Sequence, residues 1–329
     1  MTGMALRIDD IRELQALLAD RLVRTPVVRC PGLEARYGRD TRIYAKLEFL
    51  QHTGTFKARG ALSVLGSLDK AQLAAGVTAV SAGNHAIAVS FAASALGVSA
   101  KVVMTRSANR FRMERARHFG AEVFLADDVH SAFRMAESIQ EEEGRYLVHP
   151  FEGRDIVLGT ATVGAEICDQ VEDFDAILVP IGGGGLCAGI SSAVKLLNPS
   201  CEVFGVEPVG ADTMHRSFRT GQPESIETVT TIADSLGAPF AAPLSFQLCY
   251  DNVDELLTVE DEELRAAMGI LFSDMRIAIE PACAATTAAL LGPLIDRFSR
   301  QSIVLVLCGS NIDWQTFEQQ ASLGLRHVA

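Results

Sequence analysis

Segments dense in lysine or arginine are absent from this 329-residue sequence, whose formal net charge is −12. Nucleic acids and anionic membranes attract basic surfaces, so neither is expected as a partner. The seven cysteines never occur as Cys-x-x-Cys, and the seven histidines lack the spacing of metal ligands. We therefore expect no disulfide framework and no structural zinc site, and reduced thiols indicate a cytoplasmic protein.

A membrane-spanning helix is also not expected. Residues 176–194 carry no charge, but four consecutive glycines interrupt them. Each glycine costs a helix about 1 kcal/mol relative to alanine, so a strand, a glycine loop and a helix is the better interpretation. Hydrophobic residues make up 48% of the chain and charged residues 21%, which is typical of a folded globular protein.

Short apolar runs alternate with longer amphipathic segments along most of the chain. This alternation predicts an α/β fold with parallel sheets covered by helices on both faces. Strands are predicted at 77–81, 100–104, 123–125, 145–148, 176–180, 203–206 and 303–307, and helices at 85–96, 109–119, 130–142, 156–170, 186–197, 261–272 and 281–298. Residues 216–245, rich in Thr, Ser, Pro and Gly, are predicted to be irregular. Ligands of such folds bind at the carboxyl ends of strands.

Gly182–Gly185 form a run of four glycines between a predicted strand and a predicted helix. Backbone amides here can converge on one point, and the following helix adds its positive end, which together make a phosphate cradle. A flexible turn is the alternative. The run also matches the dinucleotide fingerprint Gly183-x-Gly185-x-x-Ala188, with Glu202 and Glu207 about 20 residues on. On that interpretation the protein would be a nicotinamide-dependent oxidoreductase.

Lys57 lies within Gln51-His-Thr-Gly-Thr-Phe-Lys-Ala-Arg-Gly60, between an aromatic and a small residue. Burial would lower the pKa of its ammonium group and make the neutral amine available to form a Schiff base. Ser81-Ala-Gly-Asn-His85 places small residues and then an amide at a strand-to-helix turn, which suits a carboxylate or a phenolate oxygen. Helix capping by Ser81 or Asn84 is the alternative.

Three further segments have plainer interpretations. Cys308-Gly-Ser-Asn311 follows an apolar strand, and its thiol is either a small hydrophobic group or a weak polar partner for a pyridine nitrogen. The segment from Glu207 to Asp212 is interpreted as an ordinary strand exit, because it lacks a complete set of oxygen ligands for a cation. Glu280-Pro-Ala-Cys283 is expected to begin a helix. His52 and His149 are expected to be structural or surface residues.

Together these segments resemble the fold-type II family of pyridoxal phosphate enzymes, in particular its threonine and serine dehydratase branch, close to serine racemase-like dehydratases. The resemblance covers almost the whole chain, and several motifs in the expected order are more specific than any one of them. Residues 51–61 resemble the family's Schiff-base motif, 81–86 its substrate loop, 182–185 its phosphate loop, 231–234 its mid-domain signature and 308–311 its ring-nitrogen loop. Residues 119–123, 149–151 and 205–208 also resemble strings of the family.

The resemblance implies a tryptophan-synthase-β-like fold of two doubly wound parallel-sheet domains, with pyridoxal 5'-phosphate between them. The large domain would comprise residues 1–50 and 151–329, and the small inserted domain residues 51–150. Lys57 would hold the cofactor covalently, stacked near Phe56. The other cofactor contacts would be Asn84 at the ring oxygen, Cys308 at the ring nitrogen, and Gly182, Gly183, Gly184, Gly185 and Leu186 at the phosphate. The substrate carboxylate would lie on Ser81, Ala82, Gly83, Asn84 and His85.

The resemblance also implies the reaction. The freed amine of Lys57 would remove the α-proton of a β-hydroxy amino acid, the cofactor would spread the resulting charge, and hydroxide would leave from Cβ. The products would be an α-keto acid and ammonia, with threonine or serine as the default substrate of this lyase. A homodimer is expected because family members are often dimers. The family's divalent cation would use Glu207 and the carbonyl of Ala211, but Thr213 occupies the expected acidic position.

Several residues depart from the family pattern near the expected pocket. Ala82 stands where racemases carry a second serine, so efficient racemisation is not expected. Thr55 replaces a serine, Ser235 a glycine, and Leu158-Gly-Thr-Ala-Thr162 a more usual Ala-Gly-Gln-Gly-Thr string. These changes favour a specialised substrate as the alternative, such as a hydroxyectoine-derived amino acid or 3-hydroxyaspartate. A threonine-synthase-like replacement is a further alternative.

Overall fold

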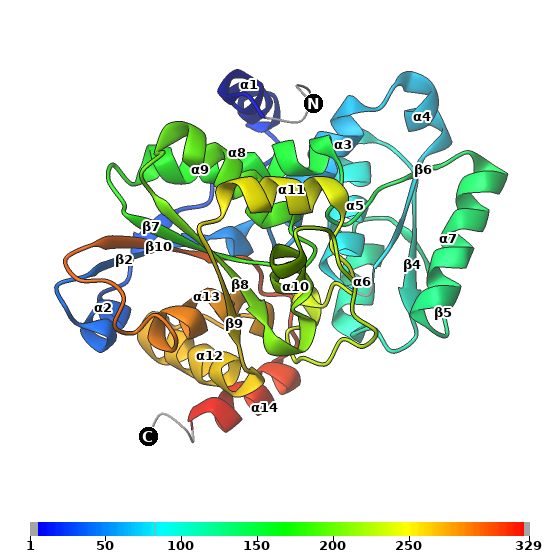
Figure 1. The fold of residues 1–329 in the computed structure, drawn as a ribbon. Coiled ribbons are helices and arrows are strands. Elements are labelled where there is room, and N and C mark those ends of the chain that lie inside the picture. Colours follow the sequence, from blue (N-terminus) through cyan, green and yellow to red (C-terminus); the bar gives the residue numbers. More distant parts are fainter. Residues whose placement is uncertain (1–5, 82, 326–329) are drawn as a thin grey trace.

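The larger of two β-sheets forms the centre of the molecule in a computed structural model that describes residues 6–81 and 83–325 (Figure 1). Its strand order is β1-β2-β10-β7-β8-β9, and only the β1–β2 pair is antiparallel. The strands are β1 (Val27–Arg29), β2 (Arg42–Leu47), β7 (Ala176–Pro180), β8 (Glu202–Pro208), β9 (Glu255–Val259) and β10 (Ser302–Leu307).

A second, four-stranded sheet is built from one continuous part of the chain. Its order is β5-β4-β3-β6, and all of its strands are parallel. The strands are β3 (Val77–Val80), β4 (Ala100–Thr105), β5 (Glu122–Ala126) and β6 (Tyr146–Leu147). Parallel strands require crossover connections, which α5 (Asn84–Leu96), α6 (Arg110–His118) and α7 (Val129–Glu143) supply here. The helices α3 (Lys57–Ser67) and α4 (Lys70–Ala75) precede this sheet in the chain.

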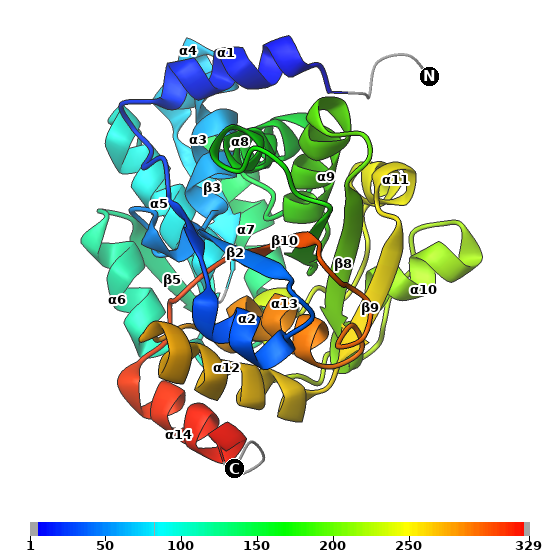
Figure 2. The ribbon, with the colours of Figure 1, turned by 90° about the vertical axis from the view of Figure 1, so that its left-hand side faces the viewer.

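Helices cover both faces of the larger sheet, as Figures 1 and 2 show from two directions. One face carries α1 (Ile8–Leu18), α8 (Arg154–Gln170), α9 (Gly185–Leu197) and α11 (Pro243–Asn252). The other face carries α2 (Pro31–Tyr37), α12 (Asp261–Met275), α13 (Pro281–Leu291) and α14 (Trp314–Leu325). The short α10 (Thr213–Thr220) and three 3₁₀ turns, Glu48–Leu50, Val209–Ala211 and Asp234–Leu236, complete the described elements.

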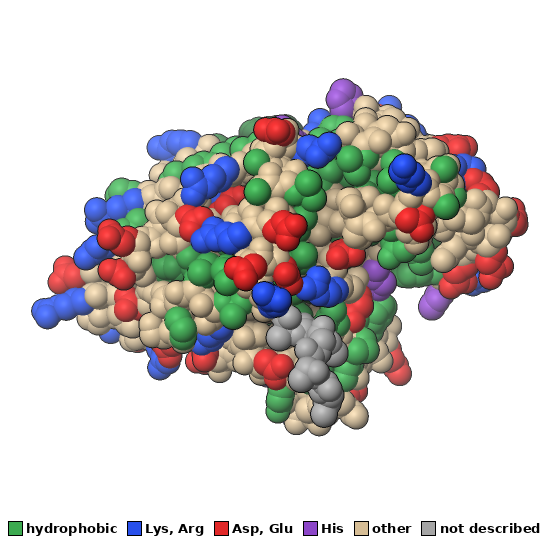
Figure 3. All heavy atoms as spheres, turned by 90° about the horizontal axis from the view of Figure 1, so that it is seen from above, with side chains coloured by type: hydrophobic (Ala, Val, Ile, Leu, Met, Phe, Trp, Pro, Cys, Tyr) green, Lys and Arg blue, Asp and Glu red, His purple; other side chains and the backbone are tan. Residues whose placement is uncertain are grey.

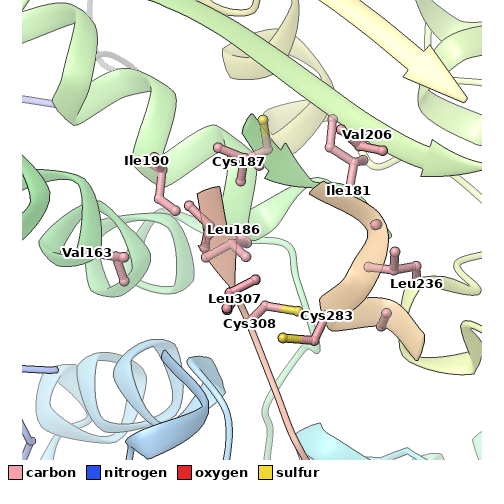
Figure 4. Packing of buried hydrophobic residues seen from close by; sticks show 14 of the residues in the cluster. Val163, Ile181, Leu186, Cys187, Ile190, Val206, Leu236, Cys283, Leu307 and Cys308 are labelled. Atoms are coloured by element: carbon pink, nitrogen blue, oxygen red, sulfur yellow. The ribbon is translucent and has the colours of Figure 1, made fainter. Parts of the chain in front are cut away.

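The core explains why the central segments carry so little charge. All five residues of β7 are buried, and so are the ten residues of α13 from Pro281 to Leu290. Strands buried on both faces read as continuous apolar runs, which is the pattern of parallel sheets. Figure 4 shows this packing where α9, β10 and α13 meet, around Leu186, Ile190, Leu307 and Cys283.

The predicted α/β fold with parallel sheets is confirmed, and one predicted helix was too long. The helix expected at 281–298 ends at Leu291, and Gly292 has φ −107° and ψ −106°. Pro293 follows, and a residue before proline is disfavoured in the helical region. The segment predicted to be irregular, 216–245, contains the end of α10, one 3₁₀ turn and the start of α11.

Among residues 6–81 and 83–325, no helix has both the length and the apolar character needed to cross a membrane. On the face shown in Figure 3, acidic and basic side chains are interspersed.

Candidate active site

Two adjoining cavities lie where the carboxyl ends of β3, β7 and β10 meet, and they share Lys57, Asn84, Pro150, Phe151, Gly183 and Ser235. The smaller cavity, of about 40 Å³, is also lined by Phe56, Gly182, Gly184, Gly185, Leu186, Glu280 and Cys308. The larger, of about 280 Å³, is also lined by Ser81, Gly83, His85, Phe133, His149 and Phe240. The structure therefore brings together all the described residues that the sequence predicted for cofactor and substrate. Ala82 lies outside the described residues.

Lys57 is the first residue of α3, and two short chain segments fix its position. Thr55 pairs with Gly309 in an isolated antiparallel bridge, and the N–H of Phe56 donates to the carbonyl of Cys308 at 3.2 Å. The Nζ atom of Lys57 donates to the carbonyl of Pro150 at 2.9 Å and lies 5.0 Å from the centre of the Phe56 ring. Burial lowers the pKa of Lys57 to about 8, and the Coulomb field of Glu280 partly opposes this shift. About one tenth of the amine is thus neutral at pH 7, far more than at the ordinary pKa of a lysine.

The glycine run connects β7 to the N-terminus of α9. The first N–H groups of a helix lack intrahelical acceptors, so this end of α9 presents free donors and a positive dipole. Gly184 adopts φ +90°, a left-handed conformation that favours glycine. A Cβ atom on Gly183 would lie 2.2 Å from the Phe151 ring, so only glycine lets that ring pack against the loop.

Cys308 follows β10 and faces Cys283 of α13, as Figure 4 shows. A hydrogen bond with Cys283 and then burial raise the pKa of the Cys308 thiol well above its usual range. The group therefore stays a neutral thiol and cannot act as the carboxylate that would keep a pyridine nitrogen protonated.

Asn84 begins α5 and is held by three side chains from distant parts of the chain. Its Nδ2 donates to Glu280 Oε1 at 2.7 Å and to Ser235 Oγ at 3.2 Å, while its Oδ1 accepts from Asn311 Nδ2 at 2.7 Å. The bond to the carboxylate is the shorter and is charge-assisted. The Asn84 amide would be available to a cofactor ring oxygen through the donor that makes the longer bond, to Ser235, which is itself one of the departures from the family pattern. The N-cap of α5 is Gly83, whose N–H donates to Ser81 Oγ at 3.1 Å, and among the described residues no side chain caps the helix itself.

His85 is a buried, neutral member of the expected substrate loop. Its Nε2 lies 2.8 Å from the carbonyl of Val148, so Nε2 carries the proton and donates it. Burial, followed by the nearby charge of Lys57, lowers the pKa of His85 to about 3. The imidazole therefore adds no positive charge to the larger cavity at neutral pH.

Glu280 and His149 line the cavities, a location that the sequence interpretation did not predict. Glu280 does precede α13, but it also lies in the smaller cavity, fully buried, with no hydrogen-bond partner for Oε2 among the described residues. His149 lines the larger cavity, and its Nδ1 accepts the N–H groups of Phe151 and Glu152 at 3.2 and 2.9 Å. Both groups were taken as structural because their neighbours in space are far apart in sequence.

An aromatic wall of the larger cavity was not predicted. The rings of His149 and Phe151 are 4.7 Å apart at 87°, and those of Phe151 and Phe240 are 5.4 Å apart. Phe133 of α7 also lines this cavity, together with Val80, Val103, Ala132, Pro150, Ala238 and Pro239. In sequence, only the string from His149 to Phe151 gave a signal, through its family resemblance. Phe133 and Phe240 reach the cavity through tertiary structure alone.

The residues that would hold the family's cation do not form a suitable site. Both carboxylate oxygens of Glu207 accept backbone N–H groups, from Met214 at 2.9 Å and His215 at 2.7 Å. Thr213 directs its hydroxyl to the carbonyl of Ala238 at 3.4 Å. Within 6–81 and 83–325, no cluster of three potential metal ligands is found. A hard divalent cation needs several free oxygen ligands, so this loop does not fit it.

The dinucleotide interpretation fails on the positions of its acidic residues. Glu202 begins β8, at the opposite end of the sheet from the glycine run, and pairs with Arg297 at 2.9 Å. Glu207 is at the correct end but is buried and occupied by two backbone donors. Neither carboxylate is free to bind a ribose hydroxyl.

A desolvated lysine, a glycine cradle at a helix N-terminus and a thiol, all at the carboxyl ends of parallel strands, define the site of a pyridoxal phosphate enzyme. The chain belongs to the pyridoxal-phosphate dependent enzyme family, which matches residues 18–309. It is 51% identical over 314 residues to a phenylserine dehydratase of Ralstonia pickettii, covering 95% of this chain and 96% of the relative. It is 35% identical over 321 residues to an L-threonine ammonia-lyase of Thermotoga maritima, covering 97% and 79%. The structure of maize serine racemase superposes with a TM-score of 0.91 at 34% identity, covering 98% and 99%.

These comparisons confirm the predicted fold type, the cofactor and the branch of the family. They also confirm the predicted reaction class, a pyridoxal phosphate-dependent lyase of the dehydratase type. The described residues fit the cofactor, because the amine of Lys57 and the N-terminus of α9 both line the smaller cavity. The buried Oε2 of Glu280 supplies a further polar group in this cavity.

Proposed function

We propose that the protein dehydrates β-hydroxy α-amino acids that carry an aromatic group on Cβ, releasing an aryl α-keto acid and ammonia. The observation that carries this proposal is the aromatic wall beside Lys57 in the 280 Å³ cavity, formed by Phe133, His149, Phe151 and Phe240. Aromatic groups prefer offset and edge-to-face contacts, which such a wall offers to a substrate ring. The phenylserine dehydratase relative supports the same substrate class.

Several described residues of the site have proposed tasks. Lys57 Nζ binds the cofactor and, once freed, removes the proton from the substrate Cα, with the Pro150 carbonyl orienting the amine. Ser81, Gly83 and Asn84 hold the substrate carboxylate at the start of α5, where the helix dipole favours an anion. The cofactor, when bound, supplies a conjugated sink for the charge that develops at Cα. Phe133 and Phe240 exclude water from the substrate side chain.

The second candidate is dehydration of threonine or serine, favoured by the threonine ammonia-lyase relative. A methyl group would leave most of the aromatic wall without contact. The specialised acidic alternative, 3-hydroxyaspartate, would place a carboxylate against the rings of Phe133 and Phe240 at a desolvation cost.

The same proposal includes the organisation of the chain. A small domain of residues 51–150 and a large domain of 1–50 and 151–329 are supported by the two sheets, whose strands fall within these ranges. A cytoplasmic location is supported by free thiols at all seven cysteines. The expected homodimer is tested by light scattering, where a mass near 35.3 kDa would indicate a monomer instead.

The substrate class is tested by ammonia release from phenylserine, threonine and serine at matched concentrations. We expect the highest kcat/KM with phenylserine, and a higher value with threonine would contradict aryl selectivity.

Phe133→Ala and Phe240→Ala should each lower kcat/KM for phenylserine about tenfold or more, because a buried aromatic contact is lost. Threonine turnover should change less than about threefold. Phe111→Ala is the matched control, since Phe111 is 37% exposed, close to Phe133 at 40% and Phe240 at 36%, and does not line the cavity.

A further inference from the structure

Helix α8 lies between the two helices that carry the two ends of the cofactor site. It packs against α3, which begins at Lys57, and against α9, which begins at Gly185. One close contact with α3 is made at Gly159, where a Cβ atom would lie 2.5 Å from the carbonyl oxygen of Arg59. The next residue, Thr160, makes a close contact with α9. Two successive residues of one helix therefore contact both of the helices that begin at the cofactor site.

Thr160 is 1% exposed, and its hydroxyl lies 2.7 Å from the carbonyl oxygen of Gly185. The same hydroxyl is 3.0 Å from the Val157 carbonyl and 3.2 Å from the Ile156 carbonyl in its own helix. A threonine hydroxyl has a single proton to donate, so the shortest contact takes it. Gly189 leaves room for this bond, because a Cβ atom there would lie 2.1 Å from Thr160 Oγ1.

The Gly185 carbonyl matters because it shares a peptide plane with the N–H of Leu186. In a planar trans peptide these two groups point in opposite directions. A bond that holds the carbonyl toward α8 therefore fixes the direction of the Leu186 N–H, one of the donors proposed for the cofactor phosphate. Thr160 itself also lines the smaller cavity.

We propose that Thr160 is a positioning residue that orients the phosphate cradle relative to Lys57. It belongs to the Leu158–Thr162 string, which departs from the family pattern and which the proposed reaction leaves without a role. The assignment rests on the proposed phosphate contacts of the glycine run and not on the identity of the substrate.

The test compares two probes that differ only in the phosphate, pyridoxal 5'-phosphate and pyridoxal. Each is titrated into full-length protein from which the cofactor has been removed, and binding is followed by absorbance. Thr160→Val keeps the shape but removes the hydroxyl, and Thr160→Ser, the matched control, keeps the hydroxyl. We expect Thr160→Val to bind pyridoxal phosphate about three- to tenfold more weakly, the loss typical of one buried hydrogen bond. Thr160→Ser should remain within about twofold of wild type, and pyridoxal should bind all three proteins equally.

Equal binding of pyridoxal phosphate by wild type and Thr160→Val would overturn the assignment, and so would an equal loss for both probes, which indicates general destabilisation. If Thr160→Val does not fold, as judged by circular dichroism, Thr160→Ala provides the same comparison. A wild-type protein that binds neither probe overturns both this assignment and the proposed function. If the three proteins bind the two probes as expected but the wild type prefers threonine to phenylserine, only the proposed function is contradicted.

Discussion

Asn84 Nδ2 donates to Glu280 Oε1 at 2.7 Å, which ties the first turn of α5 to the N-cap of α13. The second carboxylate oxygen of Glu280 lies 3.6 Å from Arg112 Nη2, beyond hydrogen-bonding distance. Burial raises the pKa of Glu280, and the positive charge of Arg112 opposes that shift. The site thus holds a buried carboxyl group whose charge acts on Lys57.

Glu280→Gln should lower the pKa of Lys57 further below its usual value, because the field of Glu280 raises it in the wild type. The amide keeps an acceptor for Asn84, so the hydrogen bond is retained while the charge is lost. The pKa is read from the pH dependence of reductive methylation of Lys57 in cofactor-free protein, by peptide mass spectrometry. Glu227→Gln, at an exposed position, is the control. An unchanged Lys57 titration would show that Glu280 carries no charge that Lys57 senses.

Lys57→Met should stabilise the cofactor-free protein at neutral pH while abolishing turnover. Burial lowers the pKa of Lys57 from 10.5 to about 8, so the folded state binds this proton less tightly than the unfolded state. The resulting penalty is complete below pH 8 and disappears as the pH rises to 10.5. Urea denaturation should therefore show a gain of about 1–3 kcal/mol at pH 7 that shrinks toward pH 10. A gain independent of pH would contradict the titration, and Lys70→Met, at an exposed site, should show none.

A comparison of Gly184→Ala with Gly221→Ala distinguishes the effect of backbone strain on stability from the effect of a changed glycine run on cofactor binding. Both glycines have positive φ, +90° and +76°, but a Cβ atom would lie 2.6 Å from Met214 Cε at Gly184 and meet nothing within 4 Å at Gly221. Each substitution should cost about 1 kcal/mol of folding stability through strain. Only Gly184→Ala should also weaken binding of pyridoxal phosphate. Equal cofactor affinity in the two variants would contradict the cradle.

Divalent cations should not bind at the Glu207 loop of the wild-type protein and should not raise its melting temperature. Both oxygens of Glu207 are bound to backbone N–H groups, and Thr213 offers no charge. Thr213→Asp supplies a second carboxylate and should introduce a rise in the melting temperature on adding Ca²⁺. Melting curves with chelator, Mg²⁺ and Ca²⁺ measure both proteins, and a wild-type curve that shifts with Ca²⁺ would disprove the interpretation.

The sequence predicted the features that depend on neighbouring residues in the chain, such as strands and the motifs that follow them. It missed the contacts between side chains that are far apart in the sequence. Strands such as 176–180 are continuous apolar runs bounded by turn residues, and the motifs at Ser81, Gly182 and Cys308 each follow one, as the structure has them. Lys57 was found because a lysine in a glycine- and hydroxyl-rich segment is unusual. Glu280 is explained by its position at the start of a helix, so its sequence context offered no reason to place it in the cavity. Phe133 and Phe240 meet around one cavity only through the fold.

The most direct test of the site is to treat the holoenzyme with borohydride and locate the reduced cofactor by peptide mass spectrometry. Reduction fixes the cofactor to the lysine that holds it. The proposed site predicts a pyridoxyl group on Lys57 alone, and displacement of the cofactor from that lysine when phenylserine is added before reduction. A pyridoxyl group on another lysine, or none at all, would contradict the central claim that Lys57 and the segments 81–85, 182–185 and 308–311 form the cofactor site.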